Sequence, residues 1–351
     1  MPPPKPLVVR GGSRKGVRIF FIPLLLAVFR LQRALVLEAG VRQGRPRASR
    51  SWFPPRSPSA ADDARPFVAI VVCIASGTYR TDWFIEGHLL SSIYETVTPE
   101  ERRHYRVELI LGYDDTDRFW QSHPRELRPR RRYRDYHGDY DGHEVIPLNF
   151  VSIRKDPGGE RPNRIPFNEL CQAAAEYGAD YIVRVNDDSE FVTSGWITVA
   201  TDALRSFDPP NVGVVGPTCK QGNTDIMTHD FVHAPTHLSI FGAYYPEVFD
   251  NYYIDDWISR VYGTARTRLL ADFEVVHHLH AFSTRYKATY HQDRLLDEEV
   301  AKGRQAVDSY LREKQSARQR KVLGTDAVEK VDGSGRMGQL HFELKKLKEM
   351  T

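Results

Sequence analysis

Two pairs of neighbouring aspartates follow apolar, strand-like segments of the chain. These are Asp114-Asp115 and Asp187-Asp188. Adjacent carboxylates repel each other unless a cation or a set of hydrogen-bond donors stabilises them. Such oxygen donors are the ligands that Mg²⁺ and Mn²⁺ prefer, and these ions typically also bind a diphosphate. The pairs therefore predict a divalent-cation site, with capping of the next helix or turn by Asp187 or Ser189 as the alternative.

The second pair lies in a stretch in which every side chain from Asn186 to Glu190 carries an oxygen atom. This density of donors directly after an apolar strand favours the metal interpretation. Glu190 is a spare oxygen donor to which the sequence assigns no role.

A third acid pair, Asp255-Asp256, begins a segment in which Trp257, Ile258 and Val261 have helical spacing. A carboxylate at this place is a candidate general base that would deprotonate an acceptor hydroxyl. The alternative is an N-cap that is favourable in the field of the helix dipole. The two roles are compatible, because one aspartate caps while the other acts as base, and the sequence does not decide between them.

Three histidines, His277, His278 and His280, follow the strand-like run Phe273–Val276. In a strand, alternate side chains point to opposite faces, so His278 and His280 share a face and His277 points away. Three imidazoles within four residues make metal ligation and a structural role comparably good interpretations.

The elements that must position these residues follow an alternating order. The predicted strands are Phe67–Ile74, Arg106–Leu111, Val145–Leu148, Asp180–Val185 and Val212–Val215, and the predicted helices are 82–95, Phe167–Tyr177 and Gly195–Phe207. This alternation is typical of an α/β fold, a single domain with a mainly parallel central sheet and helices on both faces. Ligands of such sheets bind beyond the carboxyl ends of the strands, where the acid pairs lie.

Five segments, taken in order, resemble the motifs of GT-A-fold glycosyltransferases that use nucleotide sugars. They are LGYDDTD, NRIPFNELCQAAAEYGADYI, DYIVRVNDDSEF, YYIDDWISRVYG and VVHHLHAF, which together span residues 67–285 with the first strand. The third is similar to the Asp-any-Asp metal motif, although Asn186 replaces the first acid. The overall pattern is similar to family 2 and N-acetylglucosaminyltransferase-like enzymes.

The resemblance implies a role for each matching residue. Asp188, His278 and His280 would bind the metal, and Asp255 or Asp256 would be the catalytic base. The nucleotide-sugar-binding residues would be Ser76, Asp114, Asp115, Arg164, Asn168, Asn186 and Asp187. The loop Gly216–Ser239 would line the sugar pocket. A zinc site of His229, His233 and His237, which are spaced by four, is disfavoured because Pro235 interrupts the helix that would align them.

The implied function is an inverting, Mn²⁺- or Mg²⁺-dependent transfer of a hexosyl or N-acetylhexosaminyl group from a nucleotide sugar, with UDP as the nucleotide. The acceptor would be a hydroxyl of a glycan, glycoprotein or glycolipid. Two alternatives are a sugar nucleotidyltransferase and a non-catalytic nucleotide-sugar-binding protein of the same fold. The segment Ala75-Ser76-Gly77-Thr78 lacks the glycine- and lysine-rich character of a nucleotidyltransferase phosphate loop.

Charge separates a basic arm from an acidic body. Residues 1–61 carry a net charge of +11, and the remaining residues carry −8. An acidic body argues against a nucleic-acid partner. The three cysteines, Cys73, Cys171 and Cys219, are too few and scattered for a disulfide framework or a zinc site, so we expect small core residues.

The arm contains an apolar run, Ile19–Phe29, behind a basic flank. Eleven residues are short of the ~20 that span a bilayer, and the pattern is typical of a signal peptide or weak signal-anchor. We expect a secretory-pathway, Golgi-type single-pass protein; a transit peptide and a plain disordered arm are the alternatives. The predicted organisation is arm 1–39, flexible stem 40–66, catalytic domain 67–285, packing helix 286–315 and disordered tail 316–351, with a solvated insertion at 122–144.

Overall fold

A computed structural model describes residues 64–76, 84–122, 146–154, 164–279 and 293–322, which belong to the compact unit Trp52–Thr351. The N-terminal arm, residues 123–144 of the predicted insertion and His280 lie outside the described residues.

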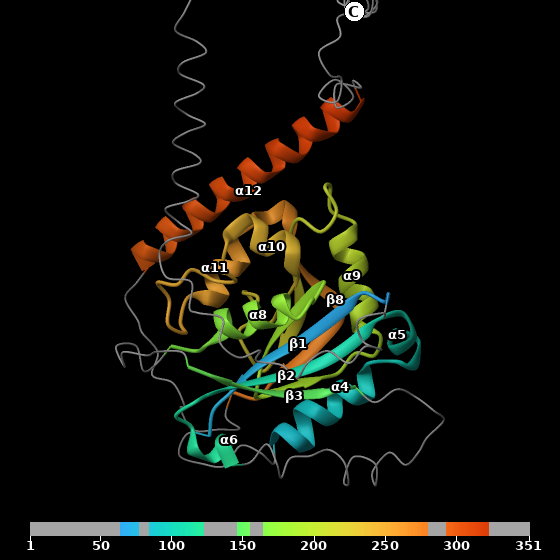
Figure 1. The fold of residues 1–351 in the computed structure, drawn as a ribbon, viewed down its shortest axis with the longest axis vertical. Coiled ribbons are helices and arrows are strands. Elements are labelled where there is room, and N and C mark those ends of the chain that lie inside the picture. The colour runs from blue at the N-terminus through green and yellow to red at the C-terminus, as the bar shows by residue number, and fades with distance from the viewer. Residues whose placement is uncertain (1–63, 77–83, 123–145, 155–163, 280–292, 323–351) are drawn as a thin grey trace, which may run out of the picture. The chain divides into compact units, whose positions relative to one another are not determined.

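A single eight-stranded sheet organises the described part of the chain, in the order β3-β2-β1-β4-β7-β6-β8-β5 (Figure 1). Its strands are β1 (Phe67–Ile74), β2 (Arg106–Asp114), β3 (Leu148–Ile153), β4 (Tyr181–Asn186), β5 (Ser189–Phe191), β6 (Val214–Lys220), β7 (Asp230–His233) and β8 (Thr267–His277). The pairs around β1, the pair β2–β3 and the pair β6–β8 are parallel, whereas β7 and β5 pair antiparallel with their neighbours. The predicted α/β class with a mainly parallel sheet is confirmed.

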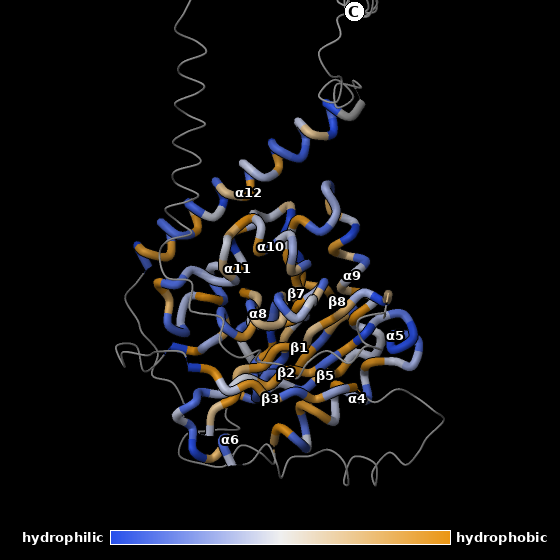
Figure 2. The backbone as a smooth tube through the Cα atoms, in the orientation of Figure 1, coloured by the Kyte–Doolittle hydropathy of each residue, from blue (hydrophilic) through white to orange (hydrophobic). Residues whose placement is uncertain are grey.

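The central strand β1 separates two apolar layers, because its residues are buried on both faces and alternate between them. Val68, Ile70 and Val72 pack in one layer, and Ala69 and Val71 pack in the other. Figure 2 shows the hydrophobic tube segments concentrated in the strands of the sheet.

Helices cover both faces of the sheet. Their bounds are η1 (π-helix, Ile85–Leu90), α4 (Ser91–Thr96), α5 (Pro99–His104), α6 (Arg118–Ser122), α8 (Phe167–Glu176), α9 (Trp196–Arg205), α10 (Ala234–Phe241), α11 (Ile254–Val261), η3 (3₁₀, Thr264–Arg266) and α12 (Asp293–Val322). Residues of η1, α4 and α9 belong to the first apolar layer, and residues of α8, α11 and α12 belong to the second. Figure 1 shows α8, α10 and α11 on the side of the sheet opposite to α4.

The clearest differences from the predicted elements concern the third strand and one loop. The third strand is Leu148–Ile153 instead of Val145–Leu148, because it is an edge strand whose half-exposed pattern hides it among the apolar runs of central strands. The predicted loop Gly216–Ser239 contains β7, most of β6 and most of α10. Short strands within polar sequence give little periodic signal.

The C-terminal helix α12 packs on the second apolar layer through Leu296, Val300 and Val307. The helix continues to Val322, although disorder was predicted from residue 316. Within the described ranges of the chain, no helix combines the length and apolar character needed to cross a bilayer.

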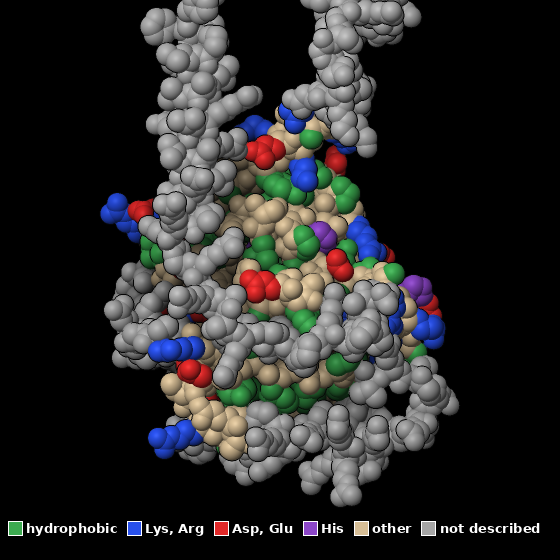
Figure 3. Space-filling model, viewed as in Figure 1, with side chains coloured by type: hydrophobic (Ala, Val, Ile, Leu, Met, Phe, Trp, Pro, Cys, Tyr) green, Lys and Arg blue, Asp and Glu red, His purple; other side chains and the backbone are tan. Residues whose placement is uncertain are grey.

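Charges of both signs are interspersed over the described surface on the face that Figure 3 shows. Cys73, Cys171 and Cys219 are buried and form no disulfide bond, as predicted. Burial raises the pKa of the Cys171 thiol well above its usual value. The three cysteines therefore behave as small core residues.

Candidate functional site

The carboxyl ends of three parallel strands lie side by side at one edge of the sheet. Ile74 of β1 pairs with Tyr113 of β2, and Cys73 pairs with Asn186 of β4. The register therefore brings the segments after β1, β2 and β4 to a common edge. Two groups of predicted site residues follow these strands.

The first group lies after β1 and β2. The carboxylate of Asp117 accepts hydrogen bonds from the Ser76 amide (2.8 Å) and from the Ser76 hydroxyl (2.9 Å). Asp114 Oδ1 accepts from the Thr116 amide (3.0 Å) and hydroxyl (2.8 Å), which closes an Asx turn. The half-buried Asp115 donates its amide to the Ile153 carbonyl at 2.9 Å. This group is a hydrogen-bonded acidic turn.

The second group centres on Asp188, whose Oδ1 lies 3.0 Å from His277 Nε2. Antiparallel pairing of β5 with β8 places Ser189 opposite His277 and fixes this contact. Burial lowers the pKa of His277, but hydrogen bonds with Asp188 and Cys219 raise it more, to about 9. At neutral pH the imidazole is therefore protonated and forms an ion pair with Asp188.

The register corrects the predicted histidine. His277, not His278, faces Asp188, because His277 is the last residue of β8 and lies next to the turn that bears the acid. His278 points away and forms a contact of 2.9 Å with Glu190. The prediction that His277 and His278 point in opposite directions is confirmed, while metal binding by these histidines stays a prediction.

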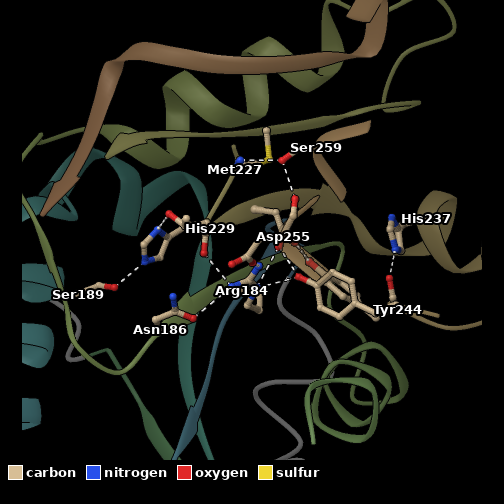
Figure 4. Close-up of polar contacts among 12 residues, drawn as sticks. Arg184, Asn186, Ser189, Met227, His229, His237, Tyr244, Asp255 and Ser259 are labelled. Atoms are coloured by element: carbon tan, nitrogen blue, oxygen red, sulfur yellow. Dashed lines mark hydrogen bonds and ion pairs between the residues drawn. The ribbon is translucent and has the colours of Figure 1, made fainter. Parts of the chain in front are cut away.

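A buried arginine, Arg184, connects the acid-bearing elements (Figure 4). Its Nε lies 3.0 Å from Asp230 Oδ2, and its Nη2 lies 2.5 Å from Asp255 Oδ1. Its Nη1 donates to Asn186 Oδ1 at 3.2 Å and to the Thr228 carbonyl at 2.8 Å. Arg184 thus links the end of β4 to the start of α11.

Two tyrosines complete this network. Tyr244 donates its hydroxyl to Asp230 Oδ1 at 2.6 Å, and Tyr245 donates to the other oxygen of Asp230. Burial raises the pKa of both phenols well above the usual value, so both remain protonated donors. Burial of Asp230 is therefore matched by several donors, as a buried carboxylate requires.

Asn186 connects the Arg184 network to the histidine that contacts Asp188. Its Oδ1 accepts a hydrogen bond from Arg184 Nη1 at 3.2 Å, and its Nδ2 lies 3.5 Å from His277 Nε2. The position at which the sequence departs from the Asp-any-Asp pattern therefore lies between the guanidinium of Arg184 and the imidazole of His277.

The two candidate bases occupy the first turn of α11. Burial raises the pKa of Asp255, while Arg184 opposes this shift. Its side chain is 29% exposed, although Arg184 contacts one of its oxygen atoms. Asp256 follows it on the helix and is half-buried.

The remaining predicted residues contact other parts of the protein. Arg164 forms a bidentate ion pair with Glu169 of α8. Asn168 donates to the Tyr245 carbonyl and accepts from the Tyr245 amide, at 3.0 and 2.7 Å. Asp187 is 4% exposed. Arg164 and Asn168 thus position α8 and the segment before α11, and their predicted contacts with a diphosphate stay predictions.

The histidines spaced by four, His229, His233 and His237, have separate hydrogen-bond partners. His229 Nε2 contacts the Ser189 hydroxyl at 2.5 Å, and His233 contacts Thr236 at 2.8 Å. His237 lies in α10, which begins at Ala234 with the proline in its first turn. The disfavoured zinc site is therefore not formed, since the three side chains belong to different elements.

Sequence reasoning did not assign the two residues that unite the site, Arg184 and His277. Arg184 had a detectable signal, because an arginine inside the apolar strand YIVRV requires a buried partner. The choice of His277 depended on strand register, which the sequence does not specify.

Comparison with known proteins gives structural similarity only. No family model and no curated protein matches the sequence. S. aureus TarS 1–349, solved in complex with UDP, is 14% identical with a TM-score of 0.38 over 68% of this chain and 65% of that chain. Glucosyl-3-phosphoglycerate synthase from Mycobacterium tuberculosis, solved with Mn²⁺, UDP and phosphoglyceric acid, is 12% identical with a TM-score of 0.33, over 74% and 84%. The chain thus matches a little less than two thirds of the TarS structure, and the chemistry of the site follows from its own residues.

Proposed function

We propose that this chain is a metal-dependent glycosyltransferase that moves a sugar from a nucleotide sugar to an acceptor hydroxyl. The observation that supports it is the convergence of Asp188, His277 and Asp255 at the carboxyl ends of the strands. Asp188 and His277 are 3.0 Å apart, and Arg184 ties Asp255 to Asn186 in the same region. The order of motifs along the sequence resembles that of GT-A transferases, and UDP is the nucleotide that this resemblance implies.

The donor set, one carboxylate and one imidazole, fits Mn²⁺ better than Mg²⁺, because Mg²⁺ prefers ligands that are all oxygen. A carboxylate and an imidazole with donor atoms 3.0 Å apart are compatible with two ligands of one ion whose bonds are about 2.1 Å long. Asp188 and His277 would hold the ion, and His277 would have to be neutral to do so. When bound, the ion would neutralise the charge that develops on the leaving nucleoside diphosphate.

The protein would contribute position and a base. Asp255 and Asp256, in the first turn of α11, are the candidates for removal of the acceptor proton, and the raised pKa of Asp255 brings it closer to that of an effective base. The base would act on the acceptor oxygen as it attacks the anomeric carbon. Arg184 is a positioning residue, because it holds the Asp255 carboxylate in one orientation.

The test measures UDP release from a panel of UDP-sugars in the presence of Mn²⁺. We expect turnover in the native chain, loss of Mn²⁺-dependent UDP binding in Asp188→Asn, and little change in the control Asp202→Asn, which removes an exposed carboxylate of α9. Comparison of Asp255→Asn with Asp256→Asn identifies the base. The variant that lacks the base should lose kcat and retain UDP binding, whereas the other variant should keep most of its kcat. Formation of a UDP-sugar from UTP and a sugar phosphate would instead select a nucleotidyltransferase, and UDP binding without turnover would select a binding protein.

The cellular location remains a proposal from the sequence of the arm, 1–39. We propose secretory-pathway, Golgi-type anchoring, on the basis of its basic flank and apolar run. Fractionation and protease protection of the tagged full chain test it, and import into another organelle would contradict it.

A further inference from the structure

A second group of metal-binding side chains lies apart from the pair Asp188–His277. It consists of His88 in the π-helix η1, Glu190 in β5, and His278 directly after β8. None of these three residues has a role in the transferase proposal. Glu190 follows Asp188 by two positions, and His278 follows His277 by one, so two of the three residues come from the strand pair that also positions Asp188 and His277.

The donor atoms of this group have the spacing of a metal site. Glu190 Oε2 lies 2.9 Å from His278 Nε2 and 3.5 Å from His88 Nδ1. One donor atom from each residue lies within 4.8 Å of the others. Ligands at ~2.1 Å from a tetrahedral ion are about 3.4 Å apart, so only small side-chain adjustments separate the observed positions from a coordinated geometry.

The surroundings hold both imidazoles in this arrangement. The buried Phe84 ring stacks on His88, with centroids 4.4 Å apart, and contacts His278 edge-on at 5.2 Å. The backbone amide of His278 donates to the Asp188 carbonyl at 2.8 Å. His88 lies on a π-helical turn, and such turns within helices are frequent at functional sites.

The set of two imidazoles and one carboxylate determines the preferred metal. Nitrogen ligands suit zinc and other late first-row ions, whereas Mg²⁺ and Ca²⁺ prefer oxygen. Two histidines and a glutamate leave at least one coordination position for water or another small ligand. The side chains of His88, Glu190 and His278 are 41, 38 and 26% exposed, so an ion can reach them from solvent.

We propose that His88, Glu190 and His278 form a zinc-binding site distinct from the acidic site of the transferase proposal. An ion there joins the helix η1–α4 to the end of β8 and to β5. It thereby supports the turn Asn186–Ser189, which carries Asp188. The zinc site does not depend on the proposed function, because neither UDP nor Asp188 contributes a ligand.

Zinc affinity of the chelator-treated full chain provides the test, measured by competition with a chromophoric chelator. Visible absorption after Co²⁺ replacement reports four-coordinate nitrogen and oxygen ligation. We expect one zinc equivalent in the native chain and a loss of affinity of at least about 100-fold in His88→Ala, His278→Ala and Glu190→Gln. The melting temperature of the native chain should rise with zinc, and this rise should be absent in the three variants.

Two controls separate this site from others. His104→Ala removes the histidine of an exposed histidine–glutamate pair, His104 with Glu100, and should leave zinc affinity unchanged. Asp188→Asn should keep the zinc equivalent even if it abolishes Mn²⁺-dependent UDP binding, so the two proposals fail independently. Unchanged zinc affinity in His88→Ala and His278→Ala, no zinc binding by the native chain, or loss of the equivalent in Asp188→Asn would each overturn the zinc site.

Discussion

Two polar clusters connected by the turn 186–190 differ sharply in burial. In the Arg184 cluster, the side chains of Arg184 and Asp230 are 1 and 0% exposed, and Asp230 accepts hydrogen bonds from Arg184 and Tyr244. In the cluster His88–Glu190–His278, between a quarter and two fifths of each side chain is exposed. A buried ionic network must be complete to be tolerated, whereas a half-exposed one is free to exchange its contacts for a ligand. We therefore expect the Arg184 cluster to contribute more to the free energy of unfolding, and the cluster His88–Glu190–His278 to bind metal ions.

Replacing Arg184 should have the largest effect on stability. Arg184→Met leaves Asp230 buried without its cationic partner, so we expect the free energy of unfolding to fall by about 3–5 kcal/mol. Urea denaturation followed by circular dichroism measures it. Arg260→Met is the matched control, because Arg260 forms an exposed ion pair with Asp297 that should contribute less than about 1 kcal/mol.

A partial rescue sharpens this prediction. Arg184→Met combined with Asp230→Asn removes both buried charges and should recover part of the lost stability. Equal effects of Arg184→Met and Arg260→Met would show that burial does not distinguish the two ion pairs.

A buried histidine next to the Arg184 cluster should make the protein sensitive to acid. His237 lies 2.8 Å from the Tyr244 carbonyl and 2.9 Å from the Tyr262 hydroxyl, and burial lowers its pKa to about 4. The unfolded chain takes up this proton near pH 6.5, before the folded protein does. The free energy of unfolding therefore has its full value above pH 6.5. It falls as the pH drops towards 4, by on the order of 3 kcal/mol.

Unfolding free energies between pH 8 and 4 check this, with His237→Gln expected to have a shallower pH dependence. His104→Gln, at an exposed histidine of α5, should retain the native slope. A native slope in His237→Gln would assign the acid sensitivity to other groups.

Removal of one hydroxyl from the buried cluster should have an intermediate effect. Tyr245→Phe eliminates a donor to Asp230 and a contact of 2.7 Å with Arg184 Nε. Hydrogen bonds to charged groups contribute about 1.5–3 kcal/mol, so we expect a loss in this range by urea denaturation. Tyr252→Phe, at a tyrosine that is 42% exposed, should change stability by less than about 0.5 kcal/mol. Similar losses in the two variants would contradict the importance of burial.

Sequence reasoning succeeded where the signal was local. β1 was predicted with its observed bounds, because eight consecutive apolar residues mark a strand buried on both faces. The helix α8 was predicted to within one residue, since Gly178 follows its last turn. The acid pair at Asp187-Asp188 was correctly placed at the end of a parallel strand.

Sequence reasoning failed where a contact depended on pairing between distant segments of the chain. The short strands β5 and β7 form because β8 and β4 accept them as antiparallel partners, and this pairing decides which histidine meets Asp188. A shift of register by one residue exchanges His277 for His278. The partners of Arg184 come from segments 46 and 71 residues away, so their contacts could not be inferred from spacing.

The smallest effect is expected in the half-exposed cluster without metal. Glu190→Gln in chelator-treated protein removes a charge that contacts His88 and His278 near solvent, where pairs of this kind contribute about 0–1 kcal/mol. We expect a change in unfolding free energy below about 0.5 kcal/mol, which zinc should enlarge because only the native chain gains the ligand's stabilisation. A loss as large as that of Tyr245→Phe in the metal-free protein would mean that Glu190 is a structural ion-pair partner, and the contrast between the two clusters would then disappear.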